Sequence, residues 1–441
     1  MKESLKETFT ELIISSQEQP FREISARDLE PEAIANVITV CVGVRRCGKS
    51  TLMEHQMRKL TKRGVKRENI VMLNFADERL ADLANENWNE LYEAYYGMYP
   101  QKRHNETVYF CFDEIQMHPN WELFVERLRR DEKCEIYITG SSAKLLAKEI
   151  HTALRGRTLS CELFPFSFGE YLNRKGIKRN GLSTTDKLKT AKAWQEYKEE
   201  GGFPEVFGLS TRARICLHQE YFDTLLYRDV VERYNISQPQ LLRQLARRML
   251  LSIGAQLSVN KLSNDFRSQG ISVSKETLMQ YIEWLEDAYF MFSIPVCTAS
   301  ICERYKRMKK VYCIDHALLK SLGNTFSDHE GQILENMVFL ALRRISREVF
   351  YYRTENGQEV DFLAIHPLTQ KKLLVQVCAD MSAESTQKRE LRALQTAMAE
   401  TGITDGIIVC ENTPQQEWKN EHGTIRAVAA TRFLAAKDAW E

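Results

Sequence analysis

The chain has 441 residues, of which 43% are hydrophobic and 27% charged, as in ordinary globular proteins, and this length predicts two or three domains. The formal net charge of +1 excludes a basic surface over the whole chain, so any contact with nucleic acid must be local. No apolar run approaches the ~18 residues that a membrane span needs, and acidic residues interrupt the N-terminus, which excludes a secretory signal there.

The cysteines and histidines argue against a disulfide framework or a zinc site. The eleven cysteines include no CxxC pair and lie mostly in apolar segments. The nine histidines show neither HExxH nor another paired spacing of metal ligands. We therefore expect reduced core thiols in a cytoplasmic protein that does not contact a membrane.

The first half of the chain predicts a parallel α/β sheet. Ser4 and Glu7 form the pattern of a capping box and predict a helix with Phe9 and Ile13 on its apolar face. From residue 37 to about residue 163, apolar strands alternate with helical stretches, and the strands read VITVCV, NIVMLNF, VYFCFDE and CEIYITG. Because continuous apolar runs indicate strands that are buried on both faces, we expect the strands to be parallel.

The second half predicts a helical region followed by mixed α/β structure. Residues 165–237 read as helices and loops. Residues 240–315 contain three helical stretches and then a two-stranded ribbon, a pattern that would make a winged helix. Beyond residue 315 we expect a helix at ILENMVFLALRRI, another near residues 386–399, and the strands VFYYR, VDFLAI, LLVQVCA and DGIIVC.

A phosphate-binding loop is predicted directly after the first strand. Residues 43–50, GVRRCGKS, match GxxxxGK[ST], in which glycines let successive backbone N–H groups turn towards phosphate oxygens. Lys49 would neutralise the β- and γ-phosphates, and Ser50 would bind Mg²⁺. The helix that follows adds an N-terminus that favours anions. The residues expected to bind the nucleotide are Gly43, Val44, Arg45, Arg46, Cys47, Gly48, Lys49, Ser50, Thr51 and Ser141.

A pair of acids at the end of a later strand supports this interpretation. VYFCFDEIQ places Asp113 and Glu114 after five apolar residues, where two adjacent acids are costly unless a cation is present. Asp113 suits the outer shell of Mg²⁺, and Glu114 suits orienting the attacking water. The cofactors that we expect are therefore ATP and Mg²⁺.

Two further segments carry candidate residues. A polar residue at the end of CEIYITGSSAKLL, from Thr139 to Ser142, would lie between the two phosphate-binding strands and could sense the γ-phosphate. A capped helix start at Ser141 or Ser142 explains the same residues and is compatible with that role. In LRGR, Arg155 and Arg157 are either solvated or serve as an arginine finger for the nucleotide of a neighbouring subunit, which would require a homo-oligomer.

The motifs resemble a known family when they are taken in order. GxxxxGKST, FDEIQ, ITGSSA, LRGR and FPFSFGEYL, followed by GGFPEV and YRDVVERY, are similar to a widespread prokaryotic family of predicted AAA-type ATPases. Its members are fusions of that ATPase domain to a C-terminal domain of restriction-endonuclease-like fold. The resemblance covers about residues 36–440 and implies a nucleotide-driven protein without indicating its substrate.

This resemblance sets the expected fold class and domains. The fold class is α/β, with a P-loop AAA-type parallel sheet, a helical and winged-helix-like module, and a C-terminal mixed α/β domain. The expected domains are an N-terminal helical extension (1–36), the AAA-type domain (37–164), a helical linker or lid (165–237), the winged-helix-like module (238–314) and the restriction-endonuclease-like domain (315–441).

The nuclease centre that this fold implies is expected to be degenerate. Such a centre needs acids for Mg²⁺ and a lysine, arranged as D…(D/E)xK on adjacent strands. Glu335 and Asp361 supply acids, but Gln376 stands in the place of the second acid and Cys378 in that of the lysine. An amide carries no charge for the metal, and a buried thiol is a poor replacement for an ammonium.

An active ATP-dependent nuclease nevertheless stays open as an alternative. Lys371 and Lys372 lie just before the strand that carries Gln376 and could supply the missing lysine. A second alternative to the ATPase is a nucleotide-gated binding protein with little turnover, which Glu114 argues against.

Weak DNA binding is the remaining expectation. Between Leu241 and Lys310 the chain has eleven Lys or Arg against six Asp or Glu, and much of this excess lies in RYKRMKK, residues 304–310. Basic side chains beside Tyr305 suit phosphate contact and stacking. The preceding helix, SKETLMQYIEWLEDA, carries one lysine against four acids, so we expect any binding to be independent of base sequence.

Overall fold

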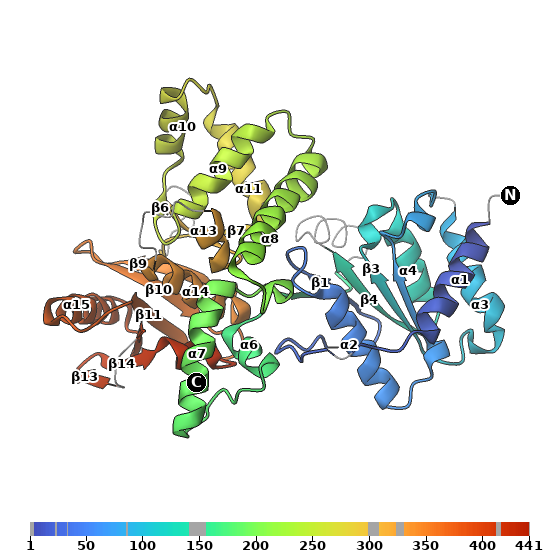
Figure 1. Cartoon of the computed structure of the whole chain (residues 1–441), viewed down its shortest axis with the longest axis horizontal. Helices are drawn as coiled ribbons and strands as arrows, with labels where there is room; N and C mark the ends of the chain where they lie inside the picture. The colour runs from blue at the N-terminus through green and yellow to red at the C-terminus, as the bar shows by residue number, and fades with distance from the viewer. Residues whose placement is uncertain are drawn as a thin grey trace. The chain divides into compact units, whose positions relative to one another are not determined.

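The computed structural model describes residues 4–22, 24–32, 34–84, 87–140, 156–298, 308–322, 330–411 and 416–440. Within this range the chain forms two compact units, one ending at Leu163 and the other beginning at Phe164 (Figure 1). Each unit is built around its own sheet or sheets, and they are described separately below.

The first unit alternates strands and helices in the predicted order. Its first helix has the predicted capping box, because Ser4 N donates to Glu7 Oε2 (3.0 Å) and Glu7 N donates to Ser4 Oγ (3.3 Å). The elements are α1 (Leu5–Glu18), β1 (Ile38–Val42), α2 (Lys49–Lys62), η1 (Arg67–Asn69), β2 (Ile70–Asn74), η2 (Glu78–Leu80), α3 (Trp88–Met98), η4 (Pro100–Lys102), β3 (Val108–Asp113), η5 (Ile115–Met117), α4 (Trp121–Asp131), β4 (Cys134–Gly140) and β5 (Thr158–Glu162).

The strands of the first unit form a five-stranded sheet in the order β2-β3-β4-β1-β5, and all its pairs are parallel. The four strands predicted from apolar runs are present, and the parallel arrangement is confirmed. β4 lies between β1 and β3, so the end of β4 separates the two strands that carry the phosphate-loop and acid motifs. The sequence analysis missed β5, which pairs with β1 at the edge of the sheet and has no fully buried residue.

The second unit begins with helices. Its early elements are α6 (Phe168–Arg174), α7 (Thr184–Glu200), η6 (Pro204–Val206), α8 (Thr211–Thr224), the π-helix η7 (Leu225–Glu232) and α9 (Pro239–Leu251). They are followed by β6 (Gln256–Leu257), α10 (Val259–Ser268), α11 (Lys275–Asp287), β7 (Met291–Ile294), β8 (Lys309–Cys313) and α13 (His316–Leu322). β8 pairs antiparallel with both β6 and β7 and is therefore the central strand of a three-stranded sheet.

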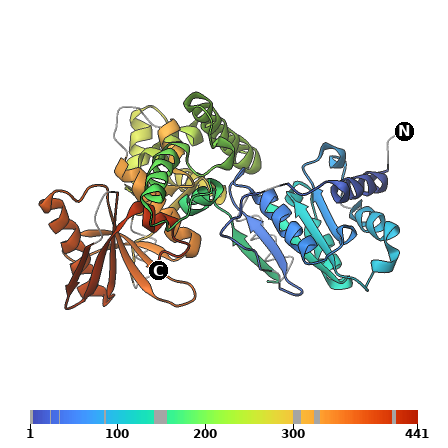
Figure 2. The ribbon, with the colours of Figure 1, turned by 60° about the horizontal axis from the view of Figure 1, so that its bottom comes forward.

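A mixed six-stranded sheet forms the C-terminal part of the second unit (Figure 2). Its elements are α14 (Glu330–Ile345), β9 (Val349–Arg353), β10 (Glu359–Ile365), β11 (Lys372–Cys378), α15 (Glu384–Thr401), β12 (Asp405–Cys410), β13 (Gln416–Asn420), β14 (Gly423–Ala429) and α16 (Ala430–Ala435). The strand order is β13-β14-β12-β11-β10-β9. The predicted helices and strands of this region are present.

A β-bulge in β10 determines which residues face α14. The pairing of β10 with β9 shifts register between Val360 and Leu363, and both of these residues pack into the core under α15. Side chains normally alternate between the faces of a strand, so the bulge lets Asp361 and Phe362 both face the other side. The ring of Phe362 lies 6.4 Å from that of Phe339 on α14, measured between centroids.

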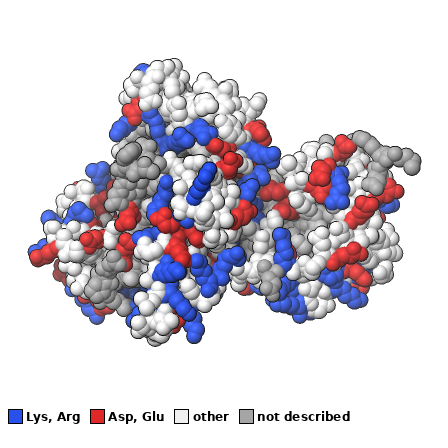
Figure 3. Space-filling view, in the orientation of Figure 1, with Lys and Arg blue, Asp and Glu red and all other residues white. Residues whose placement is uncertain are grey.

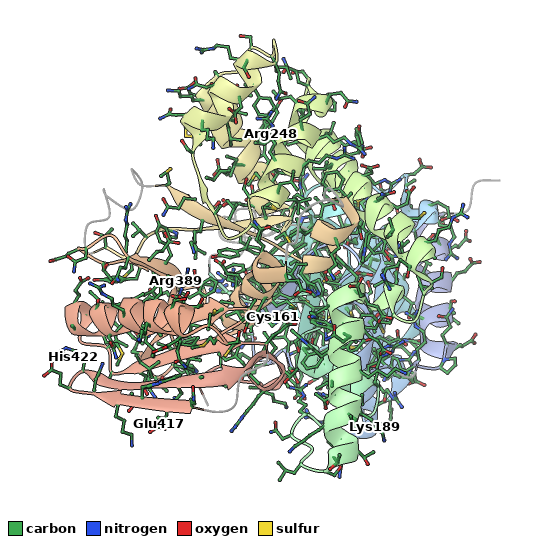
Figure 4. The ribbon with its side chains drawn as sticks, turned by 60° about the vertical axis from the view of Figure 1, so that its left-hand side comes forward. Cys161, Lys189, Arg248, Arg389, Glu417 and His422 are labelled. Carbon is green, nitrogen blue, oxygen red and sulfur yellow. The ribbon has the colours of Figure 1, made fainter. Side chains whose placement is uncertain are left out.

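Edge strand β13 was missed by the sequence analysis. Its residues are exposed or only partly buried, and charged side chains such as Glu417 point away from the sheet (Figure 4). Charged, exposed edges are common because they discourage pairing with other chains. Such a strand lacks the apolar pattern on which the prediction relied.

The surface and the cysteines agree with the composition. On the face drawn in Figure 3, Lys and Arg side chains are interspersed with Asp and Glu, in keeping with the net charge of +1. The cysteines that the structure describes are free thiols, and most are buried or partly buried. Among the described helices, none combines the length and the apolar character needed to cross a membrane.

Candidate nucleotide-binding site

The phosphate loop connects β1 to α2 and depends on its glycines. A Cβ atom on Gly43 would lie 2.1 Å from the carbonyl oxygen of Leu163, so no other residue fits there without a shift of the backbone. Gly48 has a φ of 101°, in a region that side chains rarely adopt. Arg46 also has a positive φ, 66°, as expected of a tightly turned loop. The loop therefore has the backbone turn that the GxxxxGK[ST] pattern predicts.

Lys49 is the first residue of α2 and bends back across the loop. Its Nζ donates hydrogen bonds to the carbonyl oxygens of Gly43 (3.0 Å) and Val44 (3.1 Å). Only 5% of the residue is exposed. The ammonium is thus held at the phosphate loop by two neutral acceptors, and an anion bound there would interact with it more strongly.

Arg27 is a contact of the loop that the sequence analysis missed. Its Nη1 donates to the carbonyl oxygen of Cys47 (2.9 Å) and lies 3.5 Å from the position of a Cβ on Gly48. Arg27 comes from the segment before β1, and no pattern in the sequence connects it to the loop. The Cys47 thiol is buried, and this burial raises its pKa, so Cys47 contributes its backbone rather than a thiolate.

The acids predicted to act on Mg²⁺ and water meet at the end of β4. The hydroxyl of Thr139 donates to Asp113 Oδ1 and accepts a hydrogen bond from the backbone N–H of Glu114 (3.2 Å). Thr139 is fully buried. The predicted polar residue between the two strands is therefore Thr139, whereas Ser141 and Ser142 lie outside the described residues.

Glu114 has an unusual backbone conformation. Its φ of 52° and ψ of 35° are left-handed values, which are uncommon for a residue with a side chain and are enriched at functional sites. Its Oε2 accepts a hydrogen bond from Gln116 Nε2. The other amide atom, Gln116 Oε1, is buried, and no partner for it is found in the described part of the chain. Gln116 was not recognised from the sequence.

A hollow of about 720 Å³ lies between the segment after α1, helix α2 and the strands β2 and β3. Ser50 and Asp113, the two residues predicted to hold Mg²⁺, both line it, together with Glu54 of α2 and Asn74 of β2. The segment after α1 closes one side, because Arg22 forms an ion pair with Glu54 (2.9 Å between Nη2 and Oε2). The volume is within the range of small-molecule sites.

The structure describes one of the two residues that were predicted as an arginine finger. Arg157 Nη1 donates to Glu126 Oε1 of α4 (3.0 Å), and 52% of the Arg157 side chain is exposed. Arg155 lies outside the described residues. An exposed arginine in a surface ion pair remains accessible to a neighbouring molecule, so a role in trans stays a prediction.

The residues of the predicted nuclease centre surround a lysine that the sequence analysis placed elsewhere. Lys310 was counted in the basic stretch for DNA, but it is 2% exposed and its Nζ lies 2.9 Å from Asp361 Oδ1 and 3.2 Å from Glu335 Oε1. Gln376 lies beside them, since its Oε1 accepts a hydrogen bond from Asp361 N (3.3 Å). The expectation that Lys310 contacts phosphate is therefore wrong, because β8 carries it into the second unit's interior.

The other predicted lysine candidates lie away from this cluster. Lys371 forms an ion pair with Asp405 (3.4 Å), and Lys372 is exposed at the start of β11, four residues before Gln376. Burial raises the pKa of the Cys378 thiol to about 11, so it is neutral at ordinary pH. Burial, followed by the charge of Asp361, raises the pKa of Glu335 to about 7.

A parallel sheet with a glycine loop after β1, an acid pair after β3 and a polar residue on the strand between them defines a P-loop domain of the AAA type. Residues 35–172 match the family model described as an AAA domain. Residues 191–329 and 330–432 match two families described as domains of unknown function, DUF8612 and DUF4143.

Two relatives match beyond the AAA domain. An uncharacterized protein of Methanocaldococcus jannaschii is 34% identical over 396 residues, which cover 88% of this chain and 85% of that protein. An uncharacterized protein of Haemophilus influenzae is 28% identical over 330 residues, covering 74% and 79%. The chain therefore belongs to the family of the Methanocaldococcus jannaschii protein, and the AAA part of the resemblance is confirmed.

Solved structures with similar parts are more distant. The Caenorhabditis elegans PCH-2 structure aligns with a TM-score of 0.26 and 16% identity, covering 65% of this chain and 67% of that one. The Cdc6p structure from Pyrobaculum aerophilum aligns with a TM-score of 0.26 and 11% identity, covering 68% and 87%. Both scores are below 0.5, and the AAA assignment depends on the domain match and on the strand order described above.

Proposed function

We propose that the first unit binds ATP with Mg²⁺ and hydrolyses it. The observation that carries this proposal is the contact of Thr139 with the Asp113 carboxylate and with the backbone N–H of Glu114, which holds the two acidic residues together next to the hollow that Asp113 and Ser50 line. Lys49 would neutralise the β- and γ-phosphates, and Ser50 with Asp113 would hold Mg²⁺, for which a hydroxyl and a carboxylate are suitable oxygen ligands. Glu114 would orient and polarise the attacking water.

Two substitutions test the division of roles. We expect Lys49→Ala to abolish tight ATP binding, because the loop then lacks the ammonium that donates to the carbonyl oxygens of Gly43 and Val44. Glu114→Gln should keep binding but lower phosphate release by about 10²-fold or more, the usual value of a positioned acid-base group. Nucleotide binding and phosphate release are measured on both variants, with Lys59→Ala on the far part of α2 as the control. Hydrolysis by Glu114→Gln at the wild-type rate would remove Glu114 from this role.

A nucleotide-gated binding protein with slow turnover is the second candidate, and one contact favours it. Gln116 Nε2 donates to Oε2 of the Glu114 carboxylate and so restrains the orientation in which this carboxylate could contact water at the γ-phosphate. If this contact limits turnover, Gln116→Ala raises the rate of phosphate release. An unchanged or lower rate would favour an ATPase whose turnover is not limited by the contact with Gln116.

We also propose that hydrolysis depends on assembly. Arg157, and Arg155 with it, would then act on the nucleotide of a neighbouring copy, as arginine fingers do. We expect specific activity to rise with protein concentration, and the double variant Arg155→Ala, Arg157→Ala to bind ATP normally but turn it over slowly. A monomer in every nucleotide state, with activity independent of concentration, would contradict this.

For the second unit we propose a winged-helix-like module and an inactive domain of restriction-endonuclease-like fold. The three helices with the antiparallel sheet β6-β8-β7 support the first, and Gln376 beside Asp361 supports the second. Nucleotide turnover would change the interaction of these parts with a partner, for which DNA is a candidate. Phosphate release with and without single-stranded DNA, duplex DNA and RNA tests the class of partner, since stimulation by one of them identifies it.

A further inference from the structure

Three carboxylates of the second unit converge on the ammonium of Lys310. Its Nζ lies 2.7 Å from Glu359 Oε1, 2.9 Å from Asp361 Oδ1 and 3.2 Å from Glu335 Oε1. A lysine has three N–H donors, so each can serve one carboxylate. Only 3% of the Lys310 side chain is exposed. The contact connects β8 to both α14 and β10.

Neutral donors complete the hydrogen bonding of the carboxylates. Tyr312 Oη donates to Glu335 (2.8 Å), and Gln256 Nε2 donates to Glu359 Oε2 (2.8 Å). The backbone N–H of Val377 donates to Asp361 Oδ2 (2.9 Å). Removing ions from water costs several kcal/mol for each ion, and only satisfied geometry of this kind compensates for that cost. The cluster is therefore a built site rather than a chance surface pair.

The carboxylates themselves are arranged as ligands of a cation. They come from two different elements, and the bulge in β10 turns Asp361 towards the point at which they meet. Two or three carboxylate oxygens at one point are the ligand type that Mg²⁺ and Mn²⁺ prefer. Like charges so close together repel one another unless a cation lies between them. The Lys310 ammonium lies at that point, and among the described residues no group of three or more His, Cys, Asp or Glu could hold a metal ion.

We propose that Lys310 is the resident cation of this three-carboxylate site: it takes the place of a divalent ion, closes the site to metal and fastens β8 to the C-terminal sheet. The inference goes beyond the proposed ATPase and does not depend on it. It also gives a physical reason for an inactive centre that does not rest on Gln376 alone, because a metal and the ammonium cannot occupy the same point.

Three substitutions on β8 distinguish the effect of the Lys310 charge from that of its side-chain volume. Lys310→Met keeps most of the side-chain volume without the charge, Lys310→Ala removes both, and Lys309→Ala on the same strand is the matched control. Thermal unfolding and calorimetric titration with Mn²⁺ are measured without nucleotide. We expect both Lys310 variants to unfold at lower temperature than the Lys309→Ala protein. Mn²⁺ should raise the unfolding temperature of Lys310→Ala only, with an affinity at least about tenfold above that of the wild type.

A double variant shows where the metal binds. Asp361→Asn added to Lys310→Ala should abolish the response to Mn²⁺, which separates this site from the phosphate loop. The proposal is overturned if the Lys310 variants are as stable as Lys309→Ala, or if Mn²⁺ does not stabilise Lys310→Ala.

The wild-type protein gives an independent measurement if Lys310→Ala does not fold. Its unfolding temperature should be the same with EDTA and with Mn²⁺, because the site already holds its cation. Stabilisation of the wild type by Mn²⁺ that disappears in Asp361→Asn would overturn the proposal.

Discussion

Thr139 and Lys310 are each a single side chain that contacts more than one acidic residue. The Thr139 hydroxyl contacts Asp113 and the backbone of Glu114, and it leaves the Glu114 carboxylate available to other partners. Lys310 instead engages three carboxylates directly. A neutral donor positions acids without cancelling their charge, whereas an ammonium positions them and cancels one unit of their charge. The first arrangement suits the proposed Mg²⁺ site, and the second suits a site in which an ammonium already lies among the carboxylates.

His218 gives a residue-scale prediction of pH dependence. The side chain is fully buried, its Nδ1 lies 2.8 Å from Ser321 Oγ, and no partner for Nε2 is found in the described structure. Burial lowers the pKa of His218, and the nearby charge of Asp315 only partly opposes this. Below about pH 6.5 the unfolded chain therefore binds a proton at His218, whereas the folded chain does not. The free energy of unfolding consequently decreases as the pH falls through that value.

The test compares His218→Asn with the wild type, because the Asn amide can replace Nδ1 towards Ser321. Between about pH 7 and about pH 5 the wild type should lose more thermal stability than this variant. His422→Asn, on the partly exposed turn after β13, is the control and should follow the wild type. Parallel curves for all three proteins would show that His218 does not contribute.

At the scale of elements, the turn after α9 packs against Glu335, one of the three acids around Lys310. Gly254 has a φ of 75°, and a Cβ there would lie 2.6 Å from Glu335 Oε2. Its N–H donates to the carbonyl oxygen of Val311 on β8 (3.0 Å). The turn, the strand and the helix α14 therefore meet at one carboxylate.

We expect Gly254→Ala to destabilise the protein by about 1–3 kcal/mol, from backbone strain and the contact with Glu335. Gly270→Ala is a matched control, because its φ is 78° but nothing lies within 4 Å of its Cβ position. The difference between the two variants in urea unfolding measures the contact alone. Equal destabilisation of both variants would mean that the Glu335 carboxylate moves aside freely.

The elements that the sequence predicted are those whose pattern is local. β1 is buried throughout and was found from its apolar run, as was the acid pair after β3. β5 and β13 were missed because edge strands need no continuous apolar pattern. The two-residue strand β6 and the interior strand β14 were missed as well, and only two residues of β14 are fully buried. In the candidate sites, the motif residues could be predicted. Arg27 and Lys310 could not, because their partners lie 20 and 51 residues away and only the fold brings them together.

At the scale of the whole molecule, the burial of Lys310 limits any interaction with nucleic acid. Of the basic residues from 304 to 310, Arg304, Lys306, Arg307 and Lys309 remain as candidates to bind phosphate, and the first three of them lie outside the described residues. Four neutralised phosphates give a log–log salt slope no steeper than about −3.6 for duplex DNA. The triple variant Arg304→Ala, Lys306→Ala, Arg307→Ala should flatten the slope by about one for each phosphate that is no longer neutralised, whatever the base sequence.

The control for this measurement is Lys275→Ala on α11, the helix with four acids, which should leave the slope and the sequence preference unchanged. A slope that stays the same in the triple variant would show that these side chains face solvent only. Tight binding to one sequence would show that another element contacts the bases.

The contact between Gly43 and Leu163 has a mechanical consequence. Leu163 is the last residue of the first unit, its N–H donates to Val42 (2.8 Å), and its carbonyl oxygen takes the space that a side chain on Gly43 would need. The covalent link to the second unit therefore leaves from a peptide that lies against the first glycine of the phosphate loop. Because the Leu163 carbonyl occupies the space beside Gly43, a change of the backbone at Gly43 would also move the peptide from which the chain continues into the second unit.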